Sequence, residues 1–193
     1  MATEIELKAR VKNSETLRRL LSEKAEYAFS FKREDVYWFS GASDPARIRV
    51  RKETRILPES AAEIRRTFAT YKKKQVKDGI EINDEHEFEI AGQADEFEGL
   101  LKIMGLNPGF SKQKQGWTFT KDEITAELLE VEGLGWFIEL EIVAANPAEN
   151  DAEKTLEKNK NRLLDFLDSL GISREEIESR FYSELLANPT LPG

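Results

Sequence analysis

The stretch Phe137-Ile138-Glu139-Leu140-Glu141-Ile142 alternates apolar and charged residues almost without a break, and Glu4-Ile5-Glu6-Leu7-Lys8-Ala9 repeats the pattern. Arg47-Ile48-Arg49-Val50-Arg51 and Glu85-His86-Glu87-Phe88-Glu89-Ile90 alternate in the same way. A period of two places successive side chains on opposite faces of a β-strand. These four segments therefore predict strands with one ionic face and one apolar face. Further strand-like runs are Val36 to Phe39, Thr70 to Lys74, Gly116 to Thr120 and Ile124 to Val131.

Segments with the spacing of amphipathic helices lie between and after the predicted strands. They cover residues 14–24, 94–104 and 152–170. Gly105 and Gly171 follow the second and third of these segments, and glycine just past a helical pattern is typical of a helix end. Ser173 and Glu176 have the spacing of a capping box, which predicts a short fourth helix.

The charged faces of the predicted strands are sorted by sign. The basic set is Lys8, Arg47, Arg49, Arg51, Lys72, Lys74, Lys112 and Lys114, and the acidic set is Glu4, Glu6, Glu87, Glu89, Glu130, Glu139 and Glu141. Like charges on one face of a strand repel each other, whereas a merely solvated surface would mix the signs at no cost. Rows of arginine and lysine suit phosphate oxygens, and pairs of glutamates suit hard divalent cations. A surface with both predicts a site for a phosphate chain together with its metal.

The apolar faces of the same strands need a cover, which the amphipathic helices can supply. We therefore predict an α+β fold: a closed eight-stranded antiparallel β-barrel, or tunnel, with a charged lumen and with helices packed on the outside. An unpaired ion inside a protein is costly, so we expect the two charge sets to pair across a wet tunnel until a ligand arrives. We expect residues 1–187 to form this single domain and residues 188–193 to form a frayed tail.

The composition argues against several classes of protein. The 193 residues contain no cysteine, which excludes a disulfide scaffold, a zinc–thiolate site and a thiol nucleophile. The single histidine, His86, makes a Ser-His-Asp triad improbable. The net charge of −8 argues against a nucleic-acid partner, and no segment has the apolar length of a membrane span. We expect a cytoplasmic protein without nucleic-acid or membrane partners, either a monomer or a homodimer.

Several motifs follow one another in the order found in a known family. Glu4-x-Glu6-x-Lys8 resembles the ExExK signature of the CYTH superfamily, also called the triphosphate tunnel metalloenzymes. Further segments similar to the family's motifs are Asp35 to Phe39, Ala46 to Arg49, Thr70 to Lys72, Glu87 to Glu89, Lys112 to Lys114, Leu129 to Glu141 and Ser179 to Leu186. ExExK alone is a weak signal, but the ordered set covers nearly the whole chain.

The resemblance implies an eight-stranded tunnel that binds a triphosphate together with Mg²⁺ or Mn²⁺. The residues then expected to bind the triphosphate are Lys8, Arg47, Arg49, Lys72, Lys74, Lys112 and Lys114. The residues expected to hold the metal are Glu4, Glu6, Glu87, Glu89, Glu130, Glu139 and Glu141. Glu4, Glu6 and Lys8 of the ExExK motif are the expected catalytic residues.

The activity that the resemblance implies takes one of two forms. A class IV adenylate cyclase would convert ATP to cyclic AMP and pyrophosphate, and a triphosphatase would hydrolyse thiamine triphosphate, tripolyphosphate or a nucleoside triphosphate. An organic group at the tunnel mouth could stack on Tyr37, Trp38 or Trp117, although plain packing is the simpler explanation of these rings. The alternative to an enzyme is a non-catalytic protein that binds polyphosphate or a phosphorylated metabolite.

The chain departs from the family pattern at two positions. Glu130 stands where the family usually has aspartate, which lengthens this side chain by one methylene group. Lys114 stands where arginine is common, which removes a bidentate fork.

Overall fold

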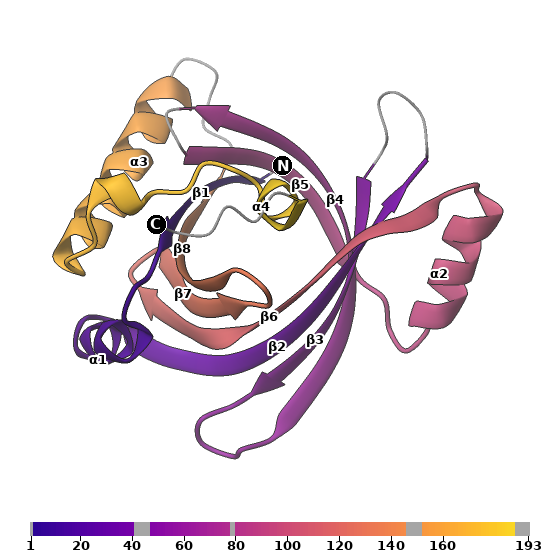
Figure 1. Ribbon diagram of the computed structural model, residues 1–193, viewed down its shortest axis with the longest axis horizontal. Coiled ribbons are helices and arrows are strands. Elements are labelled where there is room, and N and C mark those ends of the chain that lie inside the picture. The colour runs from indigo at the N-terminus through magenta and orange to yellow at the C-terminus, as the bar shows by residue number, and fades with distance from the viewer. Residues whose placement is uncertain (1, 41–46, 78–79, 146–151, 188–193) are drawn as a thin grey trace.

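The computed structural model describes residues 2–40, 47–77, 80–145 and 152–187, and Figure 1 shows the arrangement of their elements. The strands are β1 (Ala2–Arg10), β2 (Glu26–Phe39), β3 (Arg47–Ile56), β4 (Glu63–Lys77), β5 (Ile80–Glu89), β6 (Asn107–Lys121), β7 (Ile124–Val131) and β8 (Gly135–Ala145). The helices are α1 (Ser14–Lys24), α2 (Ala94–Ile103), α3 (Ala152–Ser169) and α4 (Tyr182–Ala187), with a short 3₁₀ turn at Arg174–Glu176. The three longer helices match the predicted ranges to within one residue. The predicted fourth helix is only the 3₁₀ turn, and α4 lies further along the chain.

The eight strands form one antiparallel sheet that curls round on itself (Figure 1). The order of pairing is β1-β5-β4-β3-β2-β6-β7-β8, and β8 pairs with β1 along nine residue pairs, as in a closed barrel. The predicted α+β class with a curled antiparallel sheet is confirmed. A passage that runs through the barrel as a tunnel stays a prediction, and the predicted tail, residues 188–193, lies outside the described residues.

Helices cover the apolar outer face of the sheet. Ile5 and Leu7 of β1 are buried in one cluster with Leu21 of α1 and Leu163 of α3. Burying an aliphatic side chain of this size contributes about 1.5–3 kcal/mol, so this packing decides which face of each strand points outward. The ionic residues that alternate with Ile5 and Leu7 then point into the barrel. None of the described helices is long and apolar enough to cross a membrane.

The helix α2 covers a different part of the sheet from α1 and α3 (Figure 1). Its Leu101 packs with Trp38 of β2, Val50 of β3 and Leu106 in a separate buried cluster. This cluster decides which side chains of β2 and β3 point outward. The residues next to Trp38 and Val50 must therefore face the barrel interior.

The segment after α3 returns to the barrel and contributes to its interior. Ile177 forms a β-bridge with Ala9 at the end of β1. From there α4 packs Tyr182 and Leu185 against Phe31 of β2 and Phe137 of β8, whose side chains face inward. The interior of the barrel is therefore apolar near α4 and ionic elsewhere.

Candidate functional site

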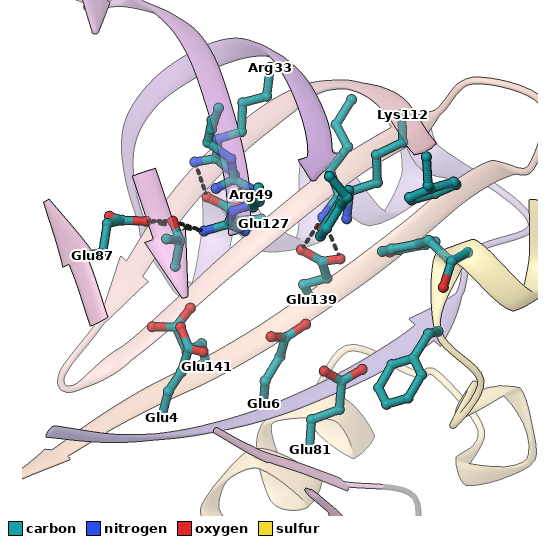
Figure 2. Close-up of a pocket in the computed structure, with 18 of the residues that line it drawn as sticks. Glu4, Glu6, Arg33, Arg49, Glu81, Glu87, Lys112, Glu127, Glu139 and Glu141 are labelled. Carbon is teal, nitrogen blue, oxygen red and sulfur yellow. Dashed lines mark hydrogen bonds and ion pairs between the residues drawn. The ribbon is translucent and has the colours of Figure 1, made fainter. Parts of the chain in front are cut away.

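The barrel contains a cavity of about 720 Å³, which is within the usual size range of small-molecule sites. All eight strands and the start of α4 contribute to its lining. Most of the lining side chains are charged. One group of carboxylates gathers on one side of the cavity, and the cations lie on the other side together with Glu87, Glu127 and Glu139, which pair with them (Figure 2). We call the first group the acidic wall, which is Glu4, Glu6, Glu81 and Glu141, and the cations the basic wall, which is Arg33, Arg49, Arg51, Lys112 and Lys114.

The acidic wall lies on β5, β1 and β8. Glu6 is directly opposite Glu81 of β5 on one side and opposite Glu141 of β8 on the other. Figure 2 shows these carboxylates and that of Glu4 pointing into one space. Like charges that face each other across neighbouring strands are destabilising. The arrangement therefore favours a cationic ligand at this wall.

The basic wall lies on β3, β2 and β6, and Figure 2 shows Arg33, Arg49 and Lys112 across the cavity from Glu4 and Glu6. In the sheet β2 lies between β3 and β6, so the inward side chains of these three strands lie next to one another and form the basic wall together. The result is a surface of three lysine or arginine strands that suits an anion with several oxygens.

Asp35 of β2 holds two cations of the basic wall. Arg51 donates its Nε to Oδ1 at 2.7 Å and a terminal nitrogen to Oδ2 at 3.0 Å, and Lys112 Nζ is 3.6 Å from Oδ2. Burial by itself would raise the pKa of Asp35, but Arg51 and Lys112 lower this pKa well below its ordinary value. Asp35 thus stays ionised and keeps Arg51 and Lys112 in fixed positions beside the cavity.

Lys114 of β6 pairs with Glu139 of β8 across the barrel interior. Its Nζ is 2.8 and 2.9 Å from the two carboxylate oxygens. Burial lowers the pKa of Lys114, Glu139 opposes this effect, and Lys112 and Arg51 add to it, so that the pKa is about 8. Burial would raise the pKa of Glu139, but the two lysines hold it well below its ordinary value. An anion that reaches Lys114 must therefore compete with Glu139.

Arg33 forms the most extensively bonded ion pairs of the basic wall. It donates Nε to Glu53 at 2.6 Å and a terminal nitrogen to Glu127 at 2.8 Å. Arg55 also bonds Glu53, and Thr118 donates to Glu127 at 3.2 Å. Because both carboxylates and the guanidinium are so fully engaged, this network is suited to holding β2, β3 and β7 together rather than to releasing a cation for a ligand.

Arg49 of β3 has the most exposed carboxylate partner among the described ion pairs of the cavity. A terminal nitrogen of Arg49 donates to Thr70 Oγ1 and to Glu87 Oε2, both at 3.0 Å, and Thr70 donates to the same glutamate oxygen at 2.8 Å. The side chain of Glu87 is 38% exposed. Glu87 is therefore the carboxylate of these ion pairs that solvent and a competing anion can reach most easily.

Of the three aromatic residues considered for an organic group, only Tyr37 lines the cavity. Its ring is 5.3 Å from that of Phe110, centroid to centroid. Trp38 is buried beneath α2, and Trp117 stacks on Trp136 on the outside of the sheet at 5.6 Å. Packing therefore explains both tryptophans.

The structure brings most of the predicted site residues together. Those that line the cavity are Glu4, Glu6, Arg49, Glu87, Lys112, Lys114, Glu139 and Glu141. Lys8 is buried beside two lining residues, 3.1 Å from Glu81 and with its Nζ 5.1 Å from the ring centre of Tyr182. The side chains of Arg47, Lys72 and Lys74 lie outside the described part of the structure. The individual roles of all these residues stay predictions.

Glu130 and Glu89 are not among the residues that line the cavity. Glu130 lies on the outer side of β7, where Gln115 donates to it at 3.0 Å. The expectation that Glu130 faces the lumen is wrong. In β7 it is Glu127 whose side chain points inward and lines the cavity. Glu89 is exposed at the end of β5, 3.9 Å from Arg66.

The sequence reasoning missed Arg33, Glu81 and Glu127, all of which line the cavity. Two of them carried a usable signal. Glu81 lies between Ile80 and Ile82, which continues the alternation predicted for residues 85–90 toward the N-terminus. Glu127 lies between Ala126 and Leu128, and both of these are buried on the outer face.

The donor atoms of the acidic wall fit a hard divalent cation, since Mg²⁺ and Mn²⁺ take carboxylate oxygens as ligands. Within the described residues, no three acidic or histidine side chains come close enough together to form a complete metal site. Mg²⁺ usually keeps several waters and binds through one or two carboxylates plus phosphate oxygens. One or two of these carboxylates could therefore hold such an ion if water or a bound anion supplied its other ligands.

Comparison with known proteins finds relatives with the same architecture. A candidate adenylate cyclase from Methanocaldococcus jannaschii, MJ0240, is 29% identical over 118 residues, which is 61% of this chain and 63% of that protein. The structure of PH1012 from Pyrococcus horikoshii is 28% identical with a TM-score of 0.74, over 94% of this chain and 98% of that one. A candidate adenylyl cyclase from Hippeastrum with dominant triphosphatase activity is 18% identical with a TM-score of 0.69, over 100% and 98% of the two chains. This last likeness shows the fold alone.

The match to a family model covers more of the chain than the match to the M. jannaschii protein. The model of the CYTH domain matches residues 2–182, a range that contains all eight strands of the barrel. The two walls of the cavity lie inside the same range, and so do the motifs quoted from the sequence, except that the last one, Ser179 to Leu186, extends four residues beyond it. The chain therefore belongs to the CYTH family.

Proposed function

We propose that the protein is a divalent-metal-dependent enzyme that hydrolyses a triphosphate bound inside the barrel. The observation that carries this proposal is the placement of the basic wall opposite the acidic wall across one cavity (Figure 2). A phosphate chain brings negative charge for the first wall, and the cation that accompanies it brings positive charge for the second. Thiamine triphosphate, tripolyphosphate and nucleoside triphosphates all present this charge pattern.

Arg49, Lys112 and Lys114 would bind the phosphate oxygens. Arg49 presents a planar guanidinium that can bind two oxygens at once, whereas the lysines act as point charges. Asp35 anchors Lys112 and Arg51, so these cations need little rearrangement when the anion binds. Phosphoryl transfer demands mainly positioning and electrostatic stabilisation from the protein, and such fixed charges supply both.

Glu4, Glu6 and Glu141, with Glu139 nearby, would hold Mg²⁺ or Mn²⁺. Such an ion, when bound, stabilises negative charge that develops on the transferred phosphoryl group and lowers the pKa of a water. The chain's own contribution is to hold these carboxylates next to the phosphates. Lys8 supports this side of the cavity through its ion pair with Glu81, which is almost completely buried.

A second candidate function is an adenylate cyclase of the class IV type. The specific observation in its favour is the pair of rings, Tyr37 and Phe110, in the cavity lining, because flat aromatic surfaces suit a nucleobase. The name of the relative from M. jannaschii points the same way. In that reaction the ribose 3′-hydroxyl would attack the α-phosphorus of ATP and pyrophosphate would leave.

An assay of the purified protein with three substrates distinguishes the candidates. Tripolyphosphate, thiamine triphosphate and ATP are each incubated with Mg²⁺ or Mn²⁺, and the products are separated by ion-exchange chromatography. Orthophosphate supports the triphosphatase, and cyclic AMP with pyrophosphate supports the cyclase. Tight binding of all three without turnover would overturn both and leave a non-catalytic polyphosphate-binding protein.

The acidic wall is tested by replacing Glu4 and Glu6 with glutamine. We expect this double variant to lose metal-dependent turnover while its circular dichroism spectrum and melting temperature stay close to those of the wild type. Glu130→Gln is the matched control, because this glutamate has the same chemistry but lies outside the barrel. Full activity in the double variant would show that the acidic wall does not act in the reaction.

A further inference from the structure

The segment after α3 is fastened to the barrel next to the cavity. The backbone N–H of Glu178 donates to the carbonyl oxygen of Lys8 at 2.8 Å. The carboxylate of Glu178 accepts from Arg10 at 3.1 and 3.2 Å and from Arg180 at 2.7 and 2.8 Å. Two arginines from different parts of the chain thus grip one glutamate, and Tyr182 follows four residues later. These contacts fix the chain just before Tyr182.

Tyr182 is buried yet its hydroxyl lacks a hydrogen-bond partner. The residue is 7% exposed and lines the cavity, and its hydroxyl makes no hydrogen bond with any described residue. The carboxylate of Glu139 is near enough to raise the pKa of this hydroxyl both by its charge and as a potential hydrogen-bond acceptor, but the two groups do not have the geometry of a formed hydrogen bond. A buried hydroxyl without a partner is costly, so phenylalanine would serve packing alone better at this position.

Three lysines surround the ring of Tyr182. The Nζ atoms of Lys112 and Lys114 are each 4.8 Å from the ring centre, and that of Lys8 is 5.1 Å away. The ring thus lies among three cations that could bind an anion, while the carboxylates of Glu139, Glu6 and Glu81 also act on the hydroxyl. Burial and Glu139 raise the pKa of Tyr182 well above its ordinary value, so the group keeps its proton and can donate it in a hydrogen bond.

We propose that Tyr182 donates a hydrogen bond from its hydroxyl to a phosphate oxygen of the bound triphosphate. The C-terminal segment is then part of the substrate site rather than only a plug at one end of the barrel. This inference rests on the proposed function, because it requires a triphosphate between the two walls. It also explains why a hydroxyl is present at a position where it forms no hydrogen bond with the described residues.

The two explanations of Tyr182 differ in what the hydroxyl contributes to the free protein. If the residue only packs, removal of the hydroxyl changes stability and leaves ligand binding unaffected. If it donates to the ligand, removal weakens binding, while the free protein keeps its stability or gains some because an unsatisfied polar group is gone.

The test is Tyr182→Phe, which keeps the ring against Phe137 and the three lysines. Binding of tripolyphosphate is measured by calorimetry in EDTA, and melting temperatures are recorded with and without the ligand. We expect affinity to fall about 10- to 100-fold, the range for one lost hydrogen bond to a charged group. The melting temperature without ligand should stay equal or rise. Tyr27→Phe, on the outer side of the sheet next to Phe119, is the matched control and should change neither.

Each result has one interpretation. If the wild type binds tripolyphosphate neither in EDTA nor in a parallel titration with Mg²⁺, the proposed function itself is wrong. If the wild type binds and Tyr182→Phe binds equally well, the proposed function stands and the role of Tyr182 is refuted. A clear loss of melting temperature in Tyr182→Phe without ligand would also refute it, because the hydroxyl would then stabilise the free protein.

Discussion

Raising the pH from 7 to 9 should weaken metal-free binding of tripolyphosphate through the deprotonation of Lys114. Burial, together with Lys112 and Arg51, lowers the pKa of Lys114 to about 8 despite the opposing effect of Glu139. A phosphate oxygen next to the ammonium group favours its charged form and raises this pKa again. Binding is therefore strongest where Lys114 already carries its proton, and it weakens as the pH rises above about 8.

The size of the effect follows from proton linkage. With a pKa of about 8 in the free protein, the charged fraction of Lys114 falls from about 0.9 at pH 7 to about 0.1 at pH 9, so affinity falls about tenfold, or about 1.4 kcal/mol. At pH 8.5 the complex should take up about 0.8 proton for each ligand bound. The stability of the free protein changes in the opposite direction. The pKa of Lys114 lies below 10.5, so its charged form opposes folding below about pH 8, and this opposition disappears as the pH rises to 10.5.

Calorimetric titrations between pH 7 and pH 9, in EDTA and in two buffers with different ionisation enthalpies, measure both affinity and proton uptake. Lys114→Arg is the control, because a guanidinium stays charged throughout this range. The ligand's own titration affects both proteins equally and cancels in their ratio. Equal pH dependence in the wild type and in Lys114→Arg, or binding at pH 8.5 without proton uptake, would refute the reasoning.

Three further substitutions test other parts of the structure. Asp35→Asn should lower the free energy of unfolding by about 3–5 kcal/mol in urea titrations, because Arg51 loses its buried carboxylate partner; a loss below about 1 kcal/mol would contradict this. Glu130→Gln should leave the kcat and KM of the metal-dependent reaction unchanged, and a tenfold loss would return Glu130 to the site. Glu178→Gln should cost about 1–2 kcal/mol at pH 7. Its difference from the wild type should shrink as the pH falls toward 2, because Arg180 lowers the pKa of Glu178 to about 2.

Glu4, Glu6 and Glu141 of the acidic wall could be predicted from the sequence because the stretches of β1 and β8 that carry them alternate between ionic and aliphatic residues. The outward residues of these stretches are aliphatic, as at Leu7 and Leu140, so the inward positions of Glu6 and Glu141 follow from the period of two. The helices that cover these strands were also visible, since their apolar spacing and terminal glycines are local features.

The basic wall was harder to predict because β2 changes character along its length. Its inner face begins with the apolar Phe29 and Phe31, which pack near α4, and continues with the ionic Arg33 and Asp35. No single polarity marks either face, so alternation alone did not identify residues 26–35 as a strand. The sequence does not show what each part of β2 contacts in the folded protein. The first half of its inner face meets the C-terminal segment, and the second half meets the cavity.

The pairing of charges could not be predicted at all, since it depends on which strands meet across the barrel. Lys114 and Glu139 lie on β6 and β8, which are separated by β7, so no rule for neighbouring strands connects them. Yet the pairing decides which cations a ligand can reach. Arg33 is held by two glutamates, whereas Arg49 shares one half-exposed glutamate with a threonine. Two arginines that are indistinguishable in the sequence thus differ in the exposure of the carboxylates described next to them, which is why we propose Arg49 rather than Arg33 as a ligand for the phosphate oxygens.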